Sequence, residues 1–252
     1  ASCVVGGVVR DTRGTQLSDA DRMNFFPASP LFTVTVTLVG QLQIAPRIMP
    51  LDALRDLPVA PRHLFMPPQS TPQTSWNAGP VCALTIAFFP DAWKRLGGAL
   101  DGTPPDSLHA PLSLLEEFPL AEAWPKFWDA LACLWTQSAG KRQAADWRGS
   151  DRLKDWTYHL LGQLAQTGAG RGLRTAQRRL ERWTGTNRQT LEFFAKVEEV
   201  HRLVTTEQAT TPAELAVDAG FADQSYMGRT LKRATGFSPV CLNRKIATEE
   251  PF

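Results

Sequence analysis

The sequence has few of the residues that build metal centres, disulfide frameworks and membrane spans. Its four cysteines lie far apart and never in a Cys-x-x-Cys spacing, at Cys3, Cys82, Cys133 and Cys241. This pattern argues against a disulfide framework or a zinc site and favours isolated thiols in a reducing cytoplasm, where we expect the protein to be located. No apolar run reaches the roughly 18 residues of a membrane helix, so no membrane partner is expected. The stretch 3–9 lacks the length and the basic flank of a signal peptide.

Histidine is equally sparse, and no catalytic pattern stands out. The four histidines lie far apart, with no His-x-His pair and no Glu at ligand spacing, at His63, His109, His159 and His201. No Ser, Cys or carboxylate pair has a recognisable catalytic spacing. We therefore expect no enzyme activity, no catalytic residue, no metal and no cofactor. A metal-dependent enzyme stays open as an alternative, because small barrels of the kind inferred below can hold a metal, and stoichiometric zinc or iron would favour it.

The net charge is small, +2 at pH 7, but it is unevenly divided. Residues 1–140 contain 9 Lys and Arg against 12 Asp and Glu, a net −3, and the remaining residues contain 18 against 13, a net +5. A basic C-terminal part behind an acidic N-terminal part is typical of a protein in which one region meets a polyanion, although surplus Lys and Arg also simply solvate a surface.

The N-terminal part has the pattern of a β-rich domain. Residues 31–39 (LFTVTVTLV) alternate Thr with apolar residues, which predicts a strand with one wet and one buried face. Residues 81–89 (VCALTIAFF) predict a second strand, and the many prolines between the two suit the turns of a small barrel or sandwich.

After Asp91 the pattern becomes helical. Pro125 is expected in a first helical turn, and a broad apolar stripe follows it, made of Phe127, Trp128, Leu131, Leu134 and Trp135. A core-facing helix is the plain interpretation, and we also hypothesise that Trp128, Leu131 and Trp135 mediate homodimerisation. Gly and charged residues over 140–155 predict the boundary near Ser150, with domains at 1–149 and 150–252.

An eight-residue motif occurs twice in the basic part. Residues 178–185 (RRLERWTG) and 229–236 (RTLKRATG) agree at five of eight positions, offset by 51 residues. Each final Gly suits the left-handed end of a helix, and Asn187 or Ser238 then stands two residues on, ready to cap the next helix. The motif therefore predicts the end of one helix and the start of another, made twice.

The second copy predicts a helix-turn-helix unit. Thr211-Pro212-Ala213-Glu214 combines an N-cap, a first-turn Pro and the Glu of a capping box, so a helix should begin there and end at Gly220. Asp223 should cap a second helix, which is the geometry that places a helix in the major groove of DNA. Met227 and Leu231 should face inward. The outward residues should be Gln224, Ser225, Gly228, Arg229 and Lys232, whose side chains suit base edges and, for Lys232 and Arg233, phosphates.

The first copy offers a similar but less regular unit. The helix over 172–183 should expose Arg174, Gln177 and Arg178, yet Gly172 stands where a capping Ser or Thr is expected. The apolar positions of 191–204 predict one continuous helix between the units, which would set two recognition helices, 172–183 and 223–235, in successive major grooves. A plain helical bundle whose hairpins share a capping pattern is the alternative to DNA binding.

The phrase GFADQSYM at 220–227, followed by GFSP at 236–239, resembles the signature of AraC/XylS family regulators. The resemblance covers about residues 150–245. It implies a DNA-binding domain of two helix-turn-helix units and adds Tyr226 to the base-contacting positions. It also implies an α+β two-domain fold, with a cupin-like β-rich N-terminal barrel extended by helices and an all-α C-terminal domain.

The same resemblance sets the expected function and partners. It implies a sequence-specific transcription regulator that binds double-stranded DNA, with a small-molecule effector in the N-terminal domain and RNA polymerase as a partner if the protein activates transcription. The alternative is a small-molecule-binding or protein-interaction module with an inactive DNA-binding domain. Loss of affinity between roughly 50 and 200 mM salt would distinguish a DNA binder from such a module.

Overall fold

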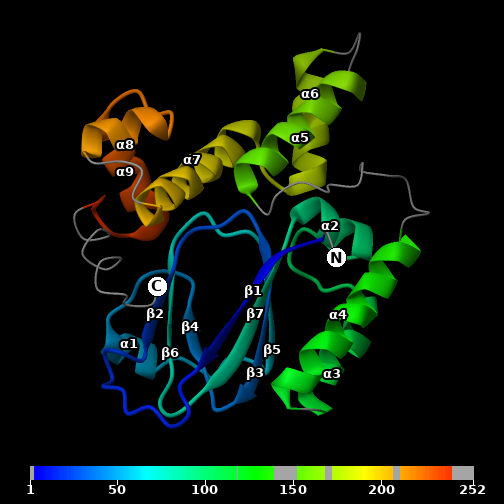
Figure 1. Ribbon diagram of the computed structural model, residues 1–252, viewed down its shortest axis with the longest axis vertical. Coiled ribbons are helices and arrows are strands. Elements are labelled where there is room, and N and C mark those ends of the chain that lie inside the picture. Colours follow the sequence, from blue (N-terminus) through cyan, green and yellow to red (C-terminus); the bar gives the residue numbers. More distant parts are fainter. Residues whose placement is uncertain (1–2, 118, 139–151, 168–171, 207–210, 240–252) are drawn as a thin grey trace.

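The computed structural model describes residues 3–117, 119–138, 152–167, 172–206 and 211–239, as a mixed α+β fold (Figure 1). Among the described residues, the strands all lie before Pro90, and the regular structure after that residue is helical. The predicted division into a β-rich N-terminal part and a helical C-terminal part is therefore confirmed. The boundary predicted near Ser150 falls outside the described residues.

Two antiparallel sheets make the N-terminal part. The four-stranded sheet has the order β1-β7-β3-β5 and consists of β1 (Val4–Asp11), β7 (Cys82–Phe88), β3 (Phe32–Val39) and β5 (His63–Met66). The three-stranded sheet has the order β2-β6-β4 and consists of β2 (Met23–Phe26), β6 (Gln73–Trp76) and β4 (Gln43–Ala45). The two strands predicted at 31–39 and 81–89 lie side by side in the centre of the larger sheet.

The Thr face of β3 is not wet, and the expectation of an exposed face there was wrong. Thr35 and Thr37 are only 6% and 8% exposed, and the Thr35 hydroxyl lies 2.9 Å from that of Thr85 on the neighbouring strand β7. Ala83, on the same face, packs with Leu42 and Ile44 from the smaller sheet. The hydroxyls of Thr35 and Thr85 satisfy each other within the larger sheet, so these two polar side chains can be covered by the smaller sheet.

The helices occupy the rest of the chain. In the first half these are α1 (Leu51–Arg55), α2 (Pro90–Leu96), α3 (His109–Glu117) and α4 (Leu120–Gln137). In the second half they are α5 (Leu153–Thr167), α6 (Leu173–Thr184), α7 (Arg188–Thr205), α8 (Pro212–Asp218) and α9 (Gln224–Thr235). Pro125 lies inside α4 rather than in its first turn, because Pro119 already forms the N-cap and accepts the amides of Glu122 and Ala123.

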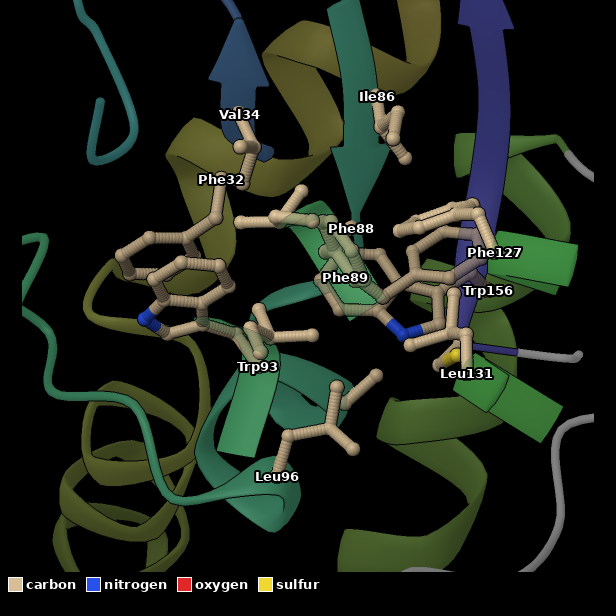
Figure 2. Packing of buried hydrophobic residues seen from close by; sticks show 14 of the residues in the cluster. Phe32, Val34, Ile86, Phe88, Phe89, Trp93, Leu96, Phe127, Leu131 and Trp156 are labelled. Carbon is tan, nitrogen blue, oxygen red and sulfur yellow. The ribbon is translucent and has the colours of Figure 1, made fainter. Parts of the chain in front are cut away.

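The larger hydrophobic core crosses from the N-terminal part into the C-terminal part. It joins the inner face of the large sheet to α2, α3 and α4, and then continues into the later helices through Trp156, Leu160, Leu164, Leu180 and Leu191. Figure 2 shows its aromatic centre, where Phe32 stacks on Trp93 with ring centroids 5.0 Å apart. A second, smaller core lies between α7, α8 and α9 and contains none of these residues.

Trp156 joins the helical part to the N-terminal part. Its ring stacks on Phe89 at 5.1 Å, and its indole N–H donates to Asp91 Oδ1 at 3.0 Å (Figure 2). Burial raises the pKa of the Asp91 carboxyl, and the hydrogen bond from Trp156, the backbone amide of Ala92 and the charge of His159 lower it only in part. The indole N–H of Trp156 thus holds the carboxyl of Asp91 at the junction.

The apolar stripe of α4 serves mainly the core. Phe127 and Leu131 are 0% exposed and lie in the larger core, so Leu131 has no surface to offer a second copy. Trp128 and Trp135 keep partial exposure, and the Arg95 guanidinium lies 3.7 Å from the centre of the Trp135 ring. The dimerisation hypothesis for this stripe stays a prediction, carried by the two tryptophans.

Candidate nucleic-acid interface

Both copies of the repeated motif end a helix in the way that the sequence predicts. Gly185 ends α6 with φ +74° and Gly236 ends α9 with φ +82°, and each donates its amide to the carbonyl four residues earlier. Asn187 then caps α7 by accepting the Thr190 amide at 2.9 Å. The cap predicted at Ser238 would begin a helix outside the described residues.

The threonine before each glycine has a role that the sequence comparison missed. The Thr184 hydroxyl lies 2.9 Å from the Leu180 carbonyl oxygen and accepts the Thr186 amide at 3.2 Å. Thr235 makes the equivalent contacts with Leu231 and Phe237, at 2.8 and 3.1 Å. The two copies, 51 residues apart, therefore share the same hydrogen bonds at the end of the helix. The identity of Thr184 and Thr235 in the aligned motif was the sequence feature that could have predicted them.

The second unit begins with a complete capping box. Thr211 Oγ1 accepts the Glu214 amide at 3.2 Å, Glu214 Oε2 accepts the Thr211 amide at 3.0 Å, and Pro212 is the first helical residue. Gly220 makes the turn with φ +75°, and Asp223 caps α9 by accepting the Tyr226 amide at 2.7 Å. Helix, short turn and second helix are thus specified by local side-chain chemistry.

Helix α9 divides cleanly into a buried face and an exposed face. Met227 and Leu231 are 0% and 3% exposed and pack in the second core, which confirms their predicted orientation. The predicted contact residues are all exposed, namely Gln224, Ser225, Tyr226, Arg229 and Lys232. The Tyr226 ring also packs edge-on against Phe221 at 5.7 Å, so its position is fixed on one side. Arg233, in contrast, lies with its guanidinium 4.9 Å from the centre of the Phe193 ring on α7.

Helix α6 has a similar division but a weaker start. Arg174, Gln177 and Arg178 are exposed, whereas Leu180 is 2% exposed and belongs to the larger core. Gly172 is the N-cap and provides no side-chain hydrogen bond, as the sequence indicates. The turn that precedes this helix, over 168–171, lies outside the described residues. The geometry therefore brings the three predicted side chains to one exposed face without fixing the beginning of the helix as firmly as in α9.

Helix α7 separates the two units as one continuous rod. It has 18 residues, or about 27 Å at 1.5 Å per residue, and α6 and α9 lie at its opposite ends (Figure 1). Its Glu199 is 6% exposed and contacts Arg152, Lys154 and Arg202. Burial alone would raise the pKa of Glu199, but the Arg202 hydrogen bond and the three cations together hold it below its ordinary value. This ion cluster fastens α7 to the start of α5.

Both predicted recognition helices are anchored to the N-terminal part by their C-terminal ends. At the end of α6, the Lys94 ammonium donates to the Arg182 carbonyl, and Gly185 lies against Leu100. At the end of α9, the Ala28 amide donates to the Ala234 carbonyl at 2.7 Å, and Phe25 meets Phe237 edge-on at 5.0 Å.

The free ends of these helices are their N-terminal ends. Each helix has 12 residues, about 18 Å, so its first turn lies roughly that far from the anchored end. In helix-turn-helix proteins the N-terminal residues of the second helix contact base edges. The anchoring therefore leaves accessible the part of each helix that such contacts require.

Across the described ranges, no three His, Cys, Asp or Glu side chains gather as a metal ion would need. Among the described helices, none has both the length and the apolar character needed to cross a membrane. Cys3 and Cys82 are buried free thiols and Cys133 is an exposed one, while Cys241 lies outside the described residues.

Comparison with known proteins gives a fold likeness and no family. No protein-family model matches the chain, and no curated protein matches it. A structure of ToxT from Vibrio cholerae has a TM-score of 0.45 at 12% identity, over 94% of this chain and 98% of that one. ToxT from strain O395 bound to (E)-4-(8-methylnaphthalen-1-yl)but-3-enoic acid has a TM-score of 0.41 at 11% identity, over 95% of this chain and 98% of that one. ToxT from strain SCE256 bound to an unsaturated fatty acid has a TM-score of 0.38 at 10% identity, over 92% of this chain and 93% of that one. At TM-scores below 0.5, this likeness assigns no function to the chain.

Proposed function

We propose that this chain is a sequence-specific DNA-binding transcription regulator of the AraC type, with double-stranded DNA as its partner. The observation that carries the proposal is the pairing of two structurally equivalent helices, α6 and α9, with the same C-terminal hydrogen bonds and exposed Arg and Gln side chains. The resemblance of residues 220–227 and 236–239 to the AraC/XylS signature supports it. In the same proposal the N-terminal part is a cupin-like sensor for a small-molecule effector, in a cytoplasmic regulator that would meet RNA polymerase if it activates transcription.

The exposed side chains suit two kinds of contact. Gln224 has an amide donor and an amide acceptor that can pair with adenine, and Arg229 has two donors that can pair with the O6 and N7 acceptors of guanine in the major groove. Both residues are exposed on α9. Lys232 lies one turn after Gly228 and carries a point charge suited to a phosphate. In α6, the exposed side chains proposed for a second major groove are Arg174, Gln177 and Arg178, of which Arg178 is the equivalent of Arg229 in the repeat. Base reading and phosphate binding should therefore be separable by mutation.

Selection from a random duplex library with the full chain would test the proposal. We expect enrichment of a site with two half-elements about one helical turn, roughly 34 Å, apart. A single enriched half-element would mean that α6 does not read bases. Absence of enrichment, together with salt-insensitive or absent binding, would refute DNA recognition and favour an interaction module with an inactive DNA-binding domain.

Two substitutions in α9 and one control would then assign the contacts. Arg229→Ala should weaken binding to the selected site by about 1–3 kcal/mol and relax one base position. Lys232→Ala should weaken all sequences alike and reduce the slope of log affinity against log salt by about 1. Arg13→Ala removes the same charge from the N-terminal part, where Arg13 pairs with Asp11 at 2.6 Å, and should leave both properties unchanged. Equal loss on all DNAs with Arg229→Ala would make that residue a phosphate contact.

A further inference from the structure

Strand β1 forms an unprotected edge of the large sheet. It is the first strand in the order β1-β7-β3-β5, so only one of its two edges is paired, with β7. Within the described residues, the only hydrogen bonds of residues 4–11 outside that pairing are made by side chains: Arg10 donates to the Asp21 carbonyl, and Asp11 accepts from Arg13. In Figure 1, β1 lies in front of the other strands of its sheet. Its outer row of amides and carbonyls is therefore available to another strand.

The exposed part of this edge is apolar and has little protection against pairing. Residues 6–9 are Gly-Gly-Val-Val and all four are exposed, with Val8 at 70% and Val9 at 47%. Natural sheets usually protect such edges with Lys, Pro, bulges or a covering element. Here the register irregularity lies between Val4 and Gly6, and the charged residues begin only at Arg10. Residues 6–9 therefore contain neither a bulge nor a charged side chain.

We propose that β1 pairs with β1 of a second copy of this chain, joining the two large sheets across a two-fold axis. An antiparallel pair of identical strands has its axis perpendicular to the sheet, and each residue then faces a residue of the same parity. With the axis at any position from Gly6 to Val9, Arg10 never faces its own mate, so no like charges oppose. Both strands are already extended within folded sheets, so this partner loses less entropy on pairing than a disordered peptide would.

Helix α4 makes this edge wide enough for an interface. The Trp124 ring lies over Gly7, where an added Cβ would come within 3.1 Å of it, so α4 runs beside β1. Eight strand residues and 18 helix residues both span about 27 Å. A perpendicular axis keeps both copies of α4 on one face of the joined sheet. The strand pair alone buries less surface than the roughly 800 Å² per partner of a standard interface. The flanking helices, with partly exposed Trp124 and Trp128, add to the buried area.

Association of the full chain measured by analytical ultracentrifugation tests the pairing. Between about 1 and 100 μM, the wild-type chain should shift from monomer to dimer. Val8→Lys should weaken dimerisation about tenfold or more by placing a charge on the edge. The control is Val217→Lys, because Val217 is 71% exposed on α8 and is thus as exposed as Val8 but far from the edge in sequence. That control should dimerise like the wild type.

Hydrogen exchange of the wild-type chain gives a second measurement that needs no variant. Amides of residues 4–11 should exchange more slowly at dimer concentrations than at monomer concentrations, since edge pairing protects them. A chain that stays monomeric at 100 μM would overturn the proposal. The proposal would also be overturned if Trp128→Glu abolished the dimer, Val8→Lys did not weaken it, and the exchange of residues 4–11 did not slow on dimerisation. That result would assign association to the face of α4 alone.

Discussion

The buried pair of Asp91 and Trp156 makes the effect of one substitution depend on pH in a defined direction. Trp156→Phe keeps an aromatic ring beside Phe89 but removes the indole N–H that donates to Asp91 Oδ1. Loss of a hydrogen bond to a charged group costs about 1.5–3 kcal/mol, and loss of one to a neutral group about 0.5–1.5 kcal/mol. The penalty should therefore be larger by about 1 kcal/mol when Asp91 is ionised than when it is protonated.

The direction of the pH dependence follows from the raised pKa of Asp91. Because burial raises this pKa in the folded state, the folded chain holds the proton more tightly than the unfolded chain, whose Asp has a pKa of about 3.9. The contribution of Asp91 to stability is thus greatest at acid pH and declines as the pH rises from the unfolded pKa through the folded one. The Trp156 N–H lowers the pKa of Asp91, so its removal raises that pKa further. The additional loss of stability therefore appears on the alkaline side.

Urea unfolding followed by circular dichroism at pH 4 and pH 8 would measure this difference. Trp93→Phe is the matched control, because Trp93 is also 0% exposed and its indole N–H donates at 3.0 Å to the uncharged carbonyl of Ala99. Its penalty should be the same at both pH values. Asp91→Asn should remove the pH dependence of the Trp156→Phe penalty. Equal penalties for Trp156→Phe at pH 4 and pH 8 would refute an ionised Asp91 at the junction.

Two further predictions concern the caps of the second unit. Thr211→Ala removes the acceptor for the Glu214 amide and should cost about 1 kcal/mol, seen as faster hydrogen exchange in α8 with little change elsewhere. Gly236→Ala should lower the melting temperature more than Gly185→Ala, since both have positive φ but an added Cβ at Gly236 would lie 2.0 Å from Ile48 Cδ1. Ile48→Ala should remove the difference between the two alanine variants. A difference that persists would mean that Ile48 is not its cause, and equal melting temperatures of the two alanine variants would mean that α9 does not dock on the N-terminal part in solution.

Local signals in the C-terminal part predicted most of its structure. The capping box at Thr211, the Asp223 cap and the left-handed glycines at 185 and 236 each depend on residues within a few positions, so the sequence alone identifies them. The orientation of α9 was predictable for the same reason, because the apolar residues Met227, Leu231 and Ala234 recur at spacings of four and three and so share one face. The contacts of Thr184 and Thr235 were visible as identity but not as hydrogen bonds.

Features that depend on distant partners were missed. Strand β1 has glycines at its centre, which weaken the strand pattern, and it is held by pairing with β7 some 75 residues later, where Val9 faces Leu84. The buried Thr row of β3 looks like a solvent-facing row until a second sheet covers it. The docking of Phe237 on Phe25 joins residues from opposite ends of the chain and left no local signal. Tertiary packing decides these features, and a single sequence contains no measure of it.

The shared core means that the helical C-terminal part does not fold independently of the sheet over its whole length. Leu160, Leu164 and Leu180 of the first helix-turn-helix unit pack in the same core as the sheet, whereas the second unit packs around Met227 in a core of its own. A fragment that begins at residue 150 would remove the apolar neighbours that the sheet and helices α2, α3 and α4 give to the first unit. Such a fragment would retain the core of the second unit but expose the apolar side chains of the first. Binding measured with it would then reflect the second unit alone.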